Sequence, residues 1–397
     1  MTTTSTIRDD AGAVSVPLLA SVFLVAAAIR IAVNNTIEFS RADESVYLLY
    51  TKALAAGQGY PHIVQMFLAD PQMWVFPNPL RWAWLGATTL FGSISGDVSH
   101  HALATLSTFA GIAVVALTYW IARELFDPSV GGVAMMLAAT SPLQLAMGRR
   151  ALADEFFCML VLASIAALLR MTSSAGRARI AWSVAWIVAT TLAIATKEQF
   201  LFLYPAILLF WWLRRRNIVD LLLCAVPPFL FFAVFCLLAR DVTSFFRITS
   251  IITGAMTAPY AEQYQNGPWF RLLIDSLAVA PLVTISTLAA LIVIALRADT
   301  QSHVMKQLGV LVVAMFAVHA LLSSQNLRYI VPVDSLARVL VAAFAVQELR
   351  TRSRVLFACV AVSAIVELKL FYEIFLVAKV YDPVTDALLR ALKMLPR

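Results

Sequence analysis

Apolar runs long enough to cross a membrane recur along the whole of this 397-residue chain. A helix needs about 20 predominantly apolar residues to span a hydrocarbon core about 30 Å thick. Such runs fall near residues 14–33, 98–122, 129–147, 154–170, 180–195, 199–213, 217–239, 271–296, 307–322, 330–347 and 355–376. Of all residues 61% are hydrophobic and only 13% are charged, against about 25% charged in soluble domains. The sequence therefore predicts an all-α polytopic membrane protein with about 11 transmembrane helices.

The distribution of Lys and Arg predicts the topology, because cytoplasmic loops carry an excess of both. The run Leu80–Gly92 is too short to cross comfortably, so we expect an interfacial or re-entrant helix there. With the N-terminus cytoplasmic and this run not crossing, the basic loops that begin at Arg170, Arg214 and Arg350 all fall on the cytoplasmic side. We expect a multi-pass protein of the plasma (inner) membrane whose acidic loops face the extracytoplasmic side.

Two extracytoplasmic loops are long, residues 34–97 and 240–269, and neither is large enough to form a core of its own. We therefore treat residues 1–397 as one membrane domain. Within the first loop, apolar residues recur at helical spacing: Val46, Leu49, Tyr50, Ala53 and Leu54. Thr51 lies on the opposite face, and Gly57 stands where a helix would end. This pattern predicts an interfacial helix that lies along the membrane surface.

Charge and cysteine usage exclude several classes of function. The net charge of +7 is spread over short loops and forms no basic domain, so nucleic acid is not an expected partner. The four cysteines lie inside apolar runs without C-x-x-C spacing, which argues against a disulfide framework or a thiolate metal site and for small core residues. The histidines supply no recognisable ligand set. We expect no required cofactor, and nothing in the sequence supports a bound divalent metal.

Two adjacent carboxylates, Asp43 and Glu44, open the interfacial helix shortly after the first span, in the stretch SRADESVYLLYTKALAAGQGYP. Asp43 has the position of an N-cap residue, whose carboxylate accepts hydrogen bonds from free backbone N–H groups. A carboxylate at the membrane boundary can also act as a general base toward a bound hydroxyl or amine. The sequence leaves both roles open for Asp43 and assigns a smaller part in catalysis to Glu44.

Further motifs follow in a fixed order on the same side of the membrane. A Gly-x-Gly-Tyr-Pro run ends the interfacial helix, and a proline-rich stretch, PNPLRW, follows it. Later segments read RRALADEFFCML, ATKEQFLFLYP and LRYIVPV. Together these motifs resemble the GT-C superfamily of polytopic glycosyltransferases, in particular the branch of protein O-mannosyltransferases and lipid A aminoarabinose transferases.

The resemblance implies a GT-C-like fold and transfer of a sugar from a polyprenyl-phosphate-linked donor to an acceptor on the outer face, with inversion. The acceptor class stays open among lipid, glycan and protein, and membrane lipids are the other expected partners. Asp43 matches the catalytic carboxylate of the family, and Asp154 matches its second acidic position. In the aminoarabinose branch a Glu-Lys pair precedes the proline-rich stretch, whereas this chain has Phe76, Pro77 and Asn78 there. The resemblance therefore does not extend to the phosphate contact and metal ligand of that branch.

Five cations stand at outer ends of spans, where the topological bias disfavours them: Arg149, Arg150, Lys197, Arg271 and Arg328. Each can be explained by snorkelling toward lipid head groups. Lys197 and Arg328 match family positions, so they are the first candidates for contacts with the donor phosphate, and Arg149 and Arg150 follow. Arg offers a bidentate contact to phosphate and Lys a point charge.

The second long loop carries Tyr260, Tyr264 and Trp269 among glycines and prolines. These residues fit an interfacial aromatic belt. They equally fit a loop that stacks on a sugar or controls access of the acceptor.

A transporter or flippase of lipid-linked sugars is the chief alternative function, and a membrane scaffold is the third. Transporters place charges and broken helices near the bilayer midplane in two repeated halves, a pattern that this sequence does not show. A scaffold gives no reason for Asp43, Asp154, Lys197 and Arg328 to gather. The test that separates the three interpretations is geometric: it asks whether these four side chains converge on one outward cavity.

Overall fold

The computed structural model describes residues 16–34, 43–214, 222–255, 265–297, 302–322 and 324–396. Over these ranges the chain is helical and contains no strand, which confirms the all-α fold. Seven segments are long and apolar enough to cross a membrane. They are centred on α1 (Val16–Asn34), α5 (His100–Leu125), α8 (Asp154–Ser173), α9 (Gly176–Ile194), α16 (Ser302–Leu321), α17 (Val331–Leu349) and α18 (Ser353–Phe371).

Other predicted spans are bent or short. Helix α6 (Pro128–Ala139) meets α7 (Pro142–Gly148) at 61°, and α12 (Val226–Ala239) meets α13 (Val242–Ala255) at 113°. Counting each bent pair as one span gives up to nine crossings among the described residues. The shorter apolar helices are α10 (Phe200–Arg214) and α15 (Pro281–Leu296). The predicted total of about 11 spans stays a prediction.

Proline explains two breaks that the apolar pattern did not predict. The predicted span 129–147 is interrupted just before Pro142, and the predicted span 271–296 divides into α14 (Arg271–Val279) and α15, which begins at Pro281. Proline has no backbone N–H and fits the first turn of a helix, where that group lacks an intrahelical partner. Both runs therefore restart as new helices at the proline.

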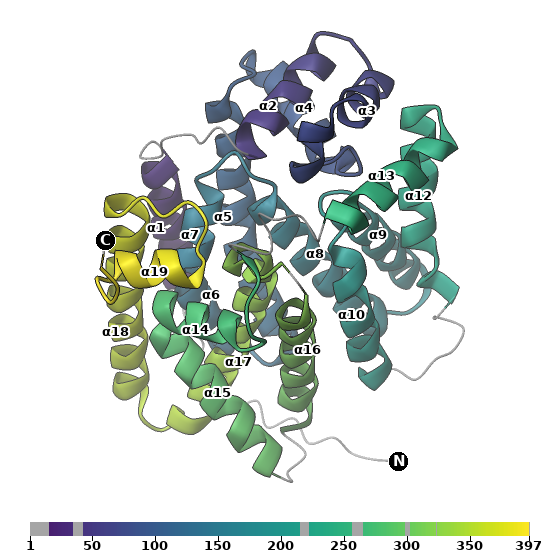
Figure 1. Cartoon of the computed structure of the whole chain (residues 1–397). Helices are drawn as coiled ribbons and strands as arrows, with labels where there is room; N and C mark the ends of the chain where they lie inside the picture. Colours follow the sequence, from purple (N-terminus) through teal and green to yellow (C-terminus); the bar gives the residue numbers. More distant parts are fainter. Residues whose placement is uncertain are drawn as a thin grey trace.

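A layer of short helices covers one end of the bundle (Figure 1). It consists of α2 (Asp43–Ala55), α3 (Tyr60–Ala69), the 3₁₀ turn η1 (Pro71–Val75) and α4 (Trp82–Ser95). Val46, Tyr50 and Ala53 of α2 are buried, as the periodicity predicts. Leu49 is instead exposed and Thr51 buried. The Thr51 hydroxyl donates to the Tyr47 carbonyl oxygen and lies 2.9 Å from the Thr88 hydroxyl of α4, so its polar group is satisfied where α2 meets α4.

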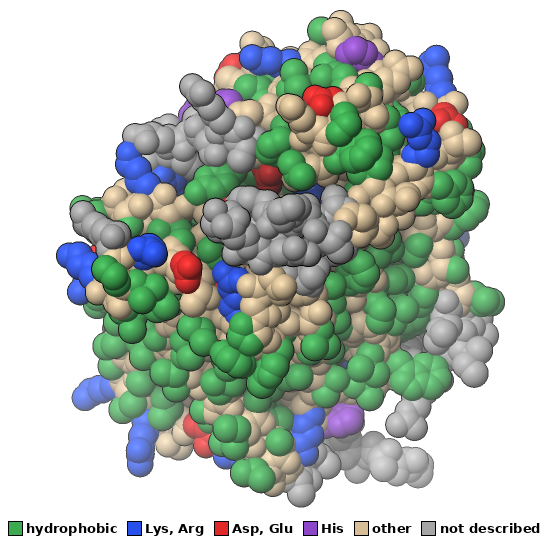
Figure 2. All heavy atoms as spheres, in the orientation of Figure 1, with side chains coloured by type: hydrophobic (Ala, Val, Ile, Leu, Met, Phe, Trp, Pro, Cys, Tyr) green, Lys and Arg blue, Asp and Glu red, His purple; other side chains and the backbone are tan. Residues whose placement is uncertain are grey.

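The surface of the bundle is apolar along its flank. Figure 2 shows a broad band of hydrophobic side chains on one face, with charged side chains mainly toward its two ends. On α15 and α18, Ile285, Ile292, Phe357 and Ile365 are all exposed. A soluble protein rarely exposes apolar surface continuously on this scale. The chain is therefore an integral membrane protein. Cys359 is also exposed, so its interpretation as a core residue was wrong.

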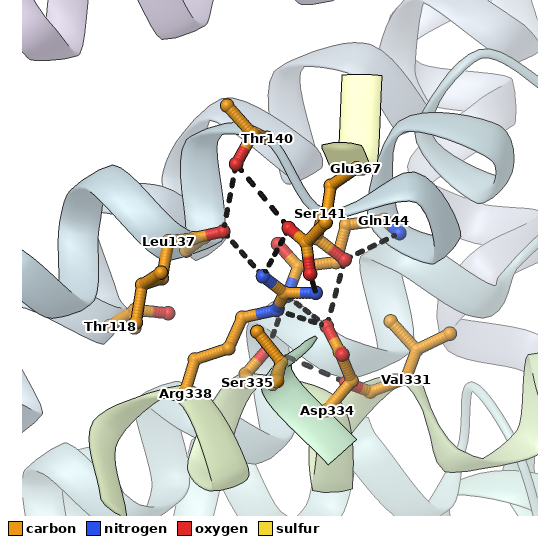
Figure 3. A network of polar contacts seen from close by, with 12 residues as sticks. Thr118, Leu137, Thr140, Ser141, Gln144, Val331, Asp334, Ser335, Arg338 and Glu367 are labelled. Carbon is orange, nitrogen blue, oxygen red and sulfur yellow. Dashed lines mark hydrogen bonds and ion pairs between the residues drawn. The ribbon is translucent and has the colours of Figure 1, made fainter. Parts of the chain in front are cut away.

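A buried polar network joins α6, α7, α17 and α18 (Figure 3). Arg338 of α17 is fully buried, and its guanidinium lies 2.8 Å from the Glu367 carboxylate of α18 and 2.9 Å from Asp334. It also donates to the Leu137 carbonyl oxygen, at 2.6 Å. Gln144 of α7 donates to Asp334 at 3.0 Å. Charges and polar groups inside the bundle are thus paired with one another, which offsets much of the cost of their burial.

We expect the loss of one partner of the Arg338–Glu367 pair to be strongly destabilising. In Glu367→Leu, the Arg338 guanidinium loses one of its carboxylate partners in the bundle interior. Breaking a buried ion pair in this way lowers the free energy of unfolding by about 3–5 kcal/mol. Unfolding of the purified protein in detergent measures this loss. Arg338→Leu combined with Glu367→Leu should recover part of it. Glu373→Leu is the matched control, because Glu373 and Lys369 form an exposed pair at 3.8 Å. Equal destabilisation by Glu367→Leu and Glu373→Leu would contradict the assignment.

The end layer predicts a topology that labelling can test. Asp70 and Ser95 are both exposed; Asp70 precedes α4, and Ser95 is its last residue. In a cysteine-free background, Asp70→Cys and Ser95→Cys should both react with a membrane-impermeant maleimide on intact cells. Arg352→Cys, in the exposed connection between α17 and α18, should react only after permeabilisation. Labelling of positions 70 and 95 from opposite sides would show that α4 crosses the membrane.

Candidate active site

Asp43 and Arg328 form the first ion pair of the site. Asp43 begins α2, and Arg328 lies in the 3₁₀ turn η3 (Leu327–Ile330) that leads into α17. Their side chains are 21% and 10% exposed, and the Arg328 Nη2 atom lies 3.0 Å from Asp43 Oδ2. The Asn326 side chain accepts a hydrogen bond from the Arg328 backbone N–H at 3.1 Å and so caps the turn that carries the arginine. Residues nearly 300 positions apart are thereby joined at the end of the bundle.

Asp154 and Lys197 form the second pair, and both are 3% exposed. Asp154 begins α8, Lys197 follows α9, and Lys197 Nζ lies 2.5 Å from Asp154 Oδ1. The Tyr329 ring adjoins both pairs, with its centroid 4.8 Å from Lys197 Nζ and 5.4 Å from Arg328 Cζ. Burial lowers the pKa of Lys197, Asp154 opposes that shift, and Arg328 adds to it. One cluster therefore contains all four side chains whose placement discriminates between the competing functions: Asp43, Asp154, Lys197 and Arg328.

Glu44 and Arg150 form a third pair, deeper than the first. Glu44 is fully buried, and its Oε1 atom accepts a hydrogen bond of 2.9 Å from Arg150 Nε. Arg150 follows α7 and is 5% exposed. The second oxygen of Glu44 and the Nη2 atom of Arg150 have no hydrogen-bond partner among the described residues. Glu44 thus faces Arg150, whereas its neighbour Asp43 faces Arg328.

Arg149 differs from the other cations of the site. It is 4% exposed, yet its Nε and Nη1 atoms find no hydrogen-bond partner in the described part of the chain. Its guanidinium lies 6.0 Å from the centre of the Phe371 ring. Burial, with a smaller contribution from Arg150, lowers the pKa of Arg149 to about 10. A buried guanidinium without a carboxylate is costly, so Arg149 adds positive charge that an anion can neutralise.

A further, partly buried pair escaped the sequence interpretation. Arg81, at the start of α4, donates to both carboxylate oxygens of Glu198, with distances of 3.0 and 2.9 Å. Arg81 also donates to the Tyr47 hydroxyl at 2.7 Å, and Asn78 donates to Glu198 at 3.0 Å. Burial raises the pKa of Glu198, but Arg81 together with the hydrogen bonds that the carboxylate accepts makes the net shift of the pKa downward. In the sequence, Arg81 stands inside the proline-rich stretch PNPLRW and Glu198 directly follows Lys197 in TKEQ, but nothing local indicates that the two residues pair.

The aromatic residues of the second long loop are not part of this cluster as far as the structure describes them. Trp269 is 65% exposed and packs edge-on against Phe270, with ring centroids 5.7 Å apart. Tyr260 and Tyr264 lie outside the described residues. Arg271 donates to the Thr385 hydroxyl at 3.2 Å and belongs to a neighbouring contact between α14 and α19 (Thr385–Ala391). A role for the three aromatic residues at the acceptor therefore stays a prediction.

The cluster combines two kinds of group that acid–base and phosphate chemistry require. Asp43 and Asp154 supply carboxylates that can accept a proton. Lys197, Arg328 and Arg150 supply cations that can bind a phosphate. No group of three His, Cys, Asp or Glu side chains arranged to hold a metal ion occurs within the described ranges.

The chain is similar to known proteins in part of its sequence and in its fold. A family model described as dolichyl-phosphate-mannose-protein mannosyltransferase matches residues 78–240, which include Asp154 and Lys197. None of the curated proteins matches the sequence significantly. The structure resembles ArnT from Cupriavidus metallidurans, solved with undecaprenyl phosphate, with a TM-score of 0.56 and 16% identity. That match covers 84% of this chain and 60% of ArnT.

Oligosaccharyltransferases from Archaeoglobus fulgidus are similar as well. One, tethered to an acceptor peptide, has a TM-score of 0.57 and 14% identity, and the match covers 89% of this chain and 54% of that protein. AglB, in complex with an inhibitory peptide and a dolichol-phosphate, has a TM-score of 0.58 and 13% identity, with 89% and 55% covered. The chain thus spans little more than half the length of these proteins. Its fold, however, is that of the GT-C membrane glycosyltransferases, as the resemblance of its motifs predicts.

Proposed function

We propose that the protein is a glycosyltransferase that moves a sugar from a polyprenyl-phosphate-linked donor to an acceptor on the extracytoplasmic face of the membrane, with inversion. The observation that carries this proposal is the meeting of two carboxylate–cation pairs at one end of the bundle. Asp43 pairs with Arg328 and Asp154 with Lys197, and the four residues come from four separate segments. Neither lipid anchoring nor packing requires such a cluster at helix ends.

The nature of the donor is supported by what the similar proteins contain. ArnT was solved with undecaprenyl phosphate and AglB with a dolichol-phosphate. Both ligands are polyprenyl phosphates, and the family model names a dolichyl-phosphate sugar. The buried cations of this chain suit the same group, because phosphate oxygens accept charge-assisted hydrogen bonds from Arg and Lys. The acceptor can be a lipid, a glycan or a protein.

In the proposed reaction the acceptor attacks the anomeric carbon as the bond to the lipid phosphate breaks. Asp43 takes the proton from the attacking hydroxyl or amine. Lys197 and Arg328 bind the phosphate and stabilise the charge that it gains as the leaving group, with Arg149 and Arg150 nearby. Asp154 holds Lys197 in place. Apart from Asp43, which is 21% exposed, these side chains are buried, and this keeps bulk water from competing as an acceptor.

The flippase alternative gains one observation from the structure. Arg338 and Glu367 are ionisable residues inside membrane-spanning helices, where charges often mark a transport pathway. In this chain, however, the guanidinium of Arg338 is engaged by Glu367, Asp334 and the Leu137 carbonyl oxygen. We therefore assign this pair to helix packing. Sugar transfer by the purified protein in reconstituted membranes, from a polyprenyl-phosphate sugar, is the measurement that separates the two functions.

If Asp43 is the general base, Asp43→Asn should lower transfer activity by about 10²- to 10⁴-fold. Asn caps a helix about as well as Asp and can still accept a hydrogen bond from Arg328, so folding should be preserved. Asp43→Ala should be equally inactive and also less stable, by about 1 kcal/mol. Asp70→Asn is the control, since Asp70 caps η1 in the same loop, outside the cluster. Near-normal turnover by Asp43→Asn would end the assignment.

If Lys197 and Arg328 bind the donor phosphate, replacing either by Met should raise the apparent KM for the donor. Loss of a charge-assisted contact of about 2–3 kcal/mol corresponds to roughly a 30- to 150-fold effect. Arg328→Lys should raise the KM less than Arg328→Met does. Lysine keeps the positive charge but lacks the planar guanidinium that binds phosphate through two N–H groups. Lys52→Met, on the exposed side of α2, should leave the KM unchanged. Unaltered donor kinetics in both single variants would favour snorkelling.

A further inference from the structure

The chain returns to the candidate active site after its last long helix. Residues 378–391, here called the return segment, follow the π-helical turn η4 (Tyr372–Val377) and end in α19. The segment is fastened on α14: the Thr385 hydroxyl donates to Asp275 Oδ1 at 2.6 Å, and Arg271 donates to the same hydroxyl. Leu388 of α19 is fully buried. From its sequence this region had no expected role.

Tyr381 of the return segment holds Arg150 from two directions. The Arg150 Nη1 atom donates to the Tyr381 carbonyl oxygen at 2.8 Å, and the guanidinium carbon lies 3.6 Å from the centre of the Tyr381 ring. On its other edge, Arg150 donates through Nε to Glu44. These contacts leave Arg150 Nη2 as the buried nitrogen without a hydrogen-bond partner among the described residues. The guanidinium is thus fixed in position with one donor free.

Asp382, the next residue, acts on Arg328 through Asn326. The Asn326 amide donates to Asp382 Oδ1 at 3.1 Å, while its oxygen accepts from the Arg328 backbone N–H. The direct contact between Asp382 and Arg328 Nη1 is 3.7 Å, too long for a hydrogen bond. Arg328 pairs with Asp43 through Nη2, and its buried Nε and Nη1 atoms have no hydrogen-bond partner in the described chain. Arg328 is therefore fixed in position by Asp43 and by the Asn326–Asp382 contact. Two of its nitrogen donors still have no hydrogen-bond partner among the described residues.

We propose that Tyr381 and Asp382 are positioning residues that orient Arg150 and Arg328 toward the phosphate of a polyprenyl phosphate. The inference rests on the proposed function and adds the return segment to the site. Both arginines are nine-tenths or more buried and keep unpartnered donors, which is the arrangement that an incoming anion completes. A fixed guanidinium loses less conformational entropy when it binds than a mobile one does. Tyr381 and Asp382 therefore increase affinity for the phosphate without touching it.

Matched substitutions separate positioning from general stability. Tyr381→Leu removes the ring beneath Arg150, whereas Tyr381→Phe removes only a hydroxyl that has no hydrogen-bond partner among the described residues. Asp382→Ala removes the acceptor for Asn326, whereas Asp382→Asn keeps an oxygen there. Since Ala and Asn both remove the charge at position 382, the comparison isolates the hydrogen bond. Asp386→Ala, an exposed carboxylate of α19, controls for changes elsewhere in the segment.

The experiment measures the Kd of undecaprenyl phosphate, without a sugar, for the purified full chain in detergent, together with the unfolding midpoint of each variant. We expect Tyr381→Leu and Asp382→Ala to raise the Kd by about 3- to 30-fold, the range set by a cation–π contact or one hydrogen bond. Tyr381→Phe and Asp386→Ala should stay within about twofold of the unaltered chain. Asp382→Asn should bind more tightly than Asp382→Ala, because only the Asn variant keeps an acceptor for Asn326.

An unchanged Kd in Tyr381→Leu and Asp382→Ala, whether or not their unfolding midpoints fall, would overturn the inference and leave the proposed function standing. If Tyr381→Leu does not fold, the comparison of Asp382→Ala with Asp382→Asn decides alone. If the unaltered chain does not bind undecaprenyl phosphate at all, the proposed donor class is wrong and the positioning role falls with it.

Discussion

Charge buried beside a hydrocarbon phase must be neutralised by partners, because water is not available to solvate it. This constraint organises the covered end of the bundle. Lys197 is paired with Asp154, Arg150 with Glu44 and Arg81 with Glu198, and each cation–carboxylate distance is 3.0 Å or less. Each pair joins residues from different helices or connections. The ion pairs therefore determine how the helix ends and the α2–α4 layer fit together, as well as where chemistry can take place.

The helix breaks determine which side chains can meet. Asp154 begins α8 directly after the short helix α7, and Arg328 lies in a 3₁₀ turn immediately before α17. If these residues lay within continuous helices, the helical repeat alone would set the directions of their side chains. Short turns at the ends of spans let several helices direct a polar group toward one place. Proline residues such as Pro142 supply such breaks, since they restart a helix without requiring a backbone N–H.

Apolar runs predicted the helices, and the resemblance of short motifs to the GT-C superfamily drew attention to the four residues of the cluster, Asp43, Asp154, Lys197 and Arg328. Both signals are visible within short windows of sequence. They did not predict where helices break, since a proline in an apolar run fits either a kink or a new start. They also missed the partnership of Arg81 and Glu198, and the return of the chain after α18. Those contacts connect segments more than 100 residues apart, and nothing local in the sequence specifies them.

On the proposed function, the donor phosphate enters a site whose arginines are mostly paired already but keep unpartnered donors, so it adds to the anions there and competes with them for the same cations. A phosphate on the free donors of Arg328 shares the positive charge that Asp43 uses, which leaves the Asp43 carboxylate more available to the proton of the acceptor. Binding of the donor then prepares the base, and an empty site keeps that carboxylate engaged. Arg149, which has no carboxylate partner among the described residues, makes binding of the phosphate favourable because it adds positive charge that the incoming anion can neutralise.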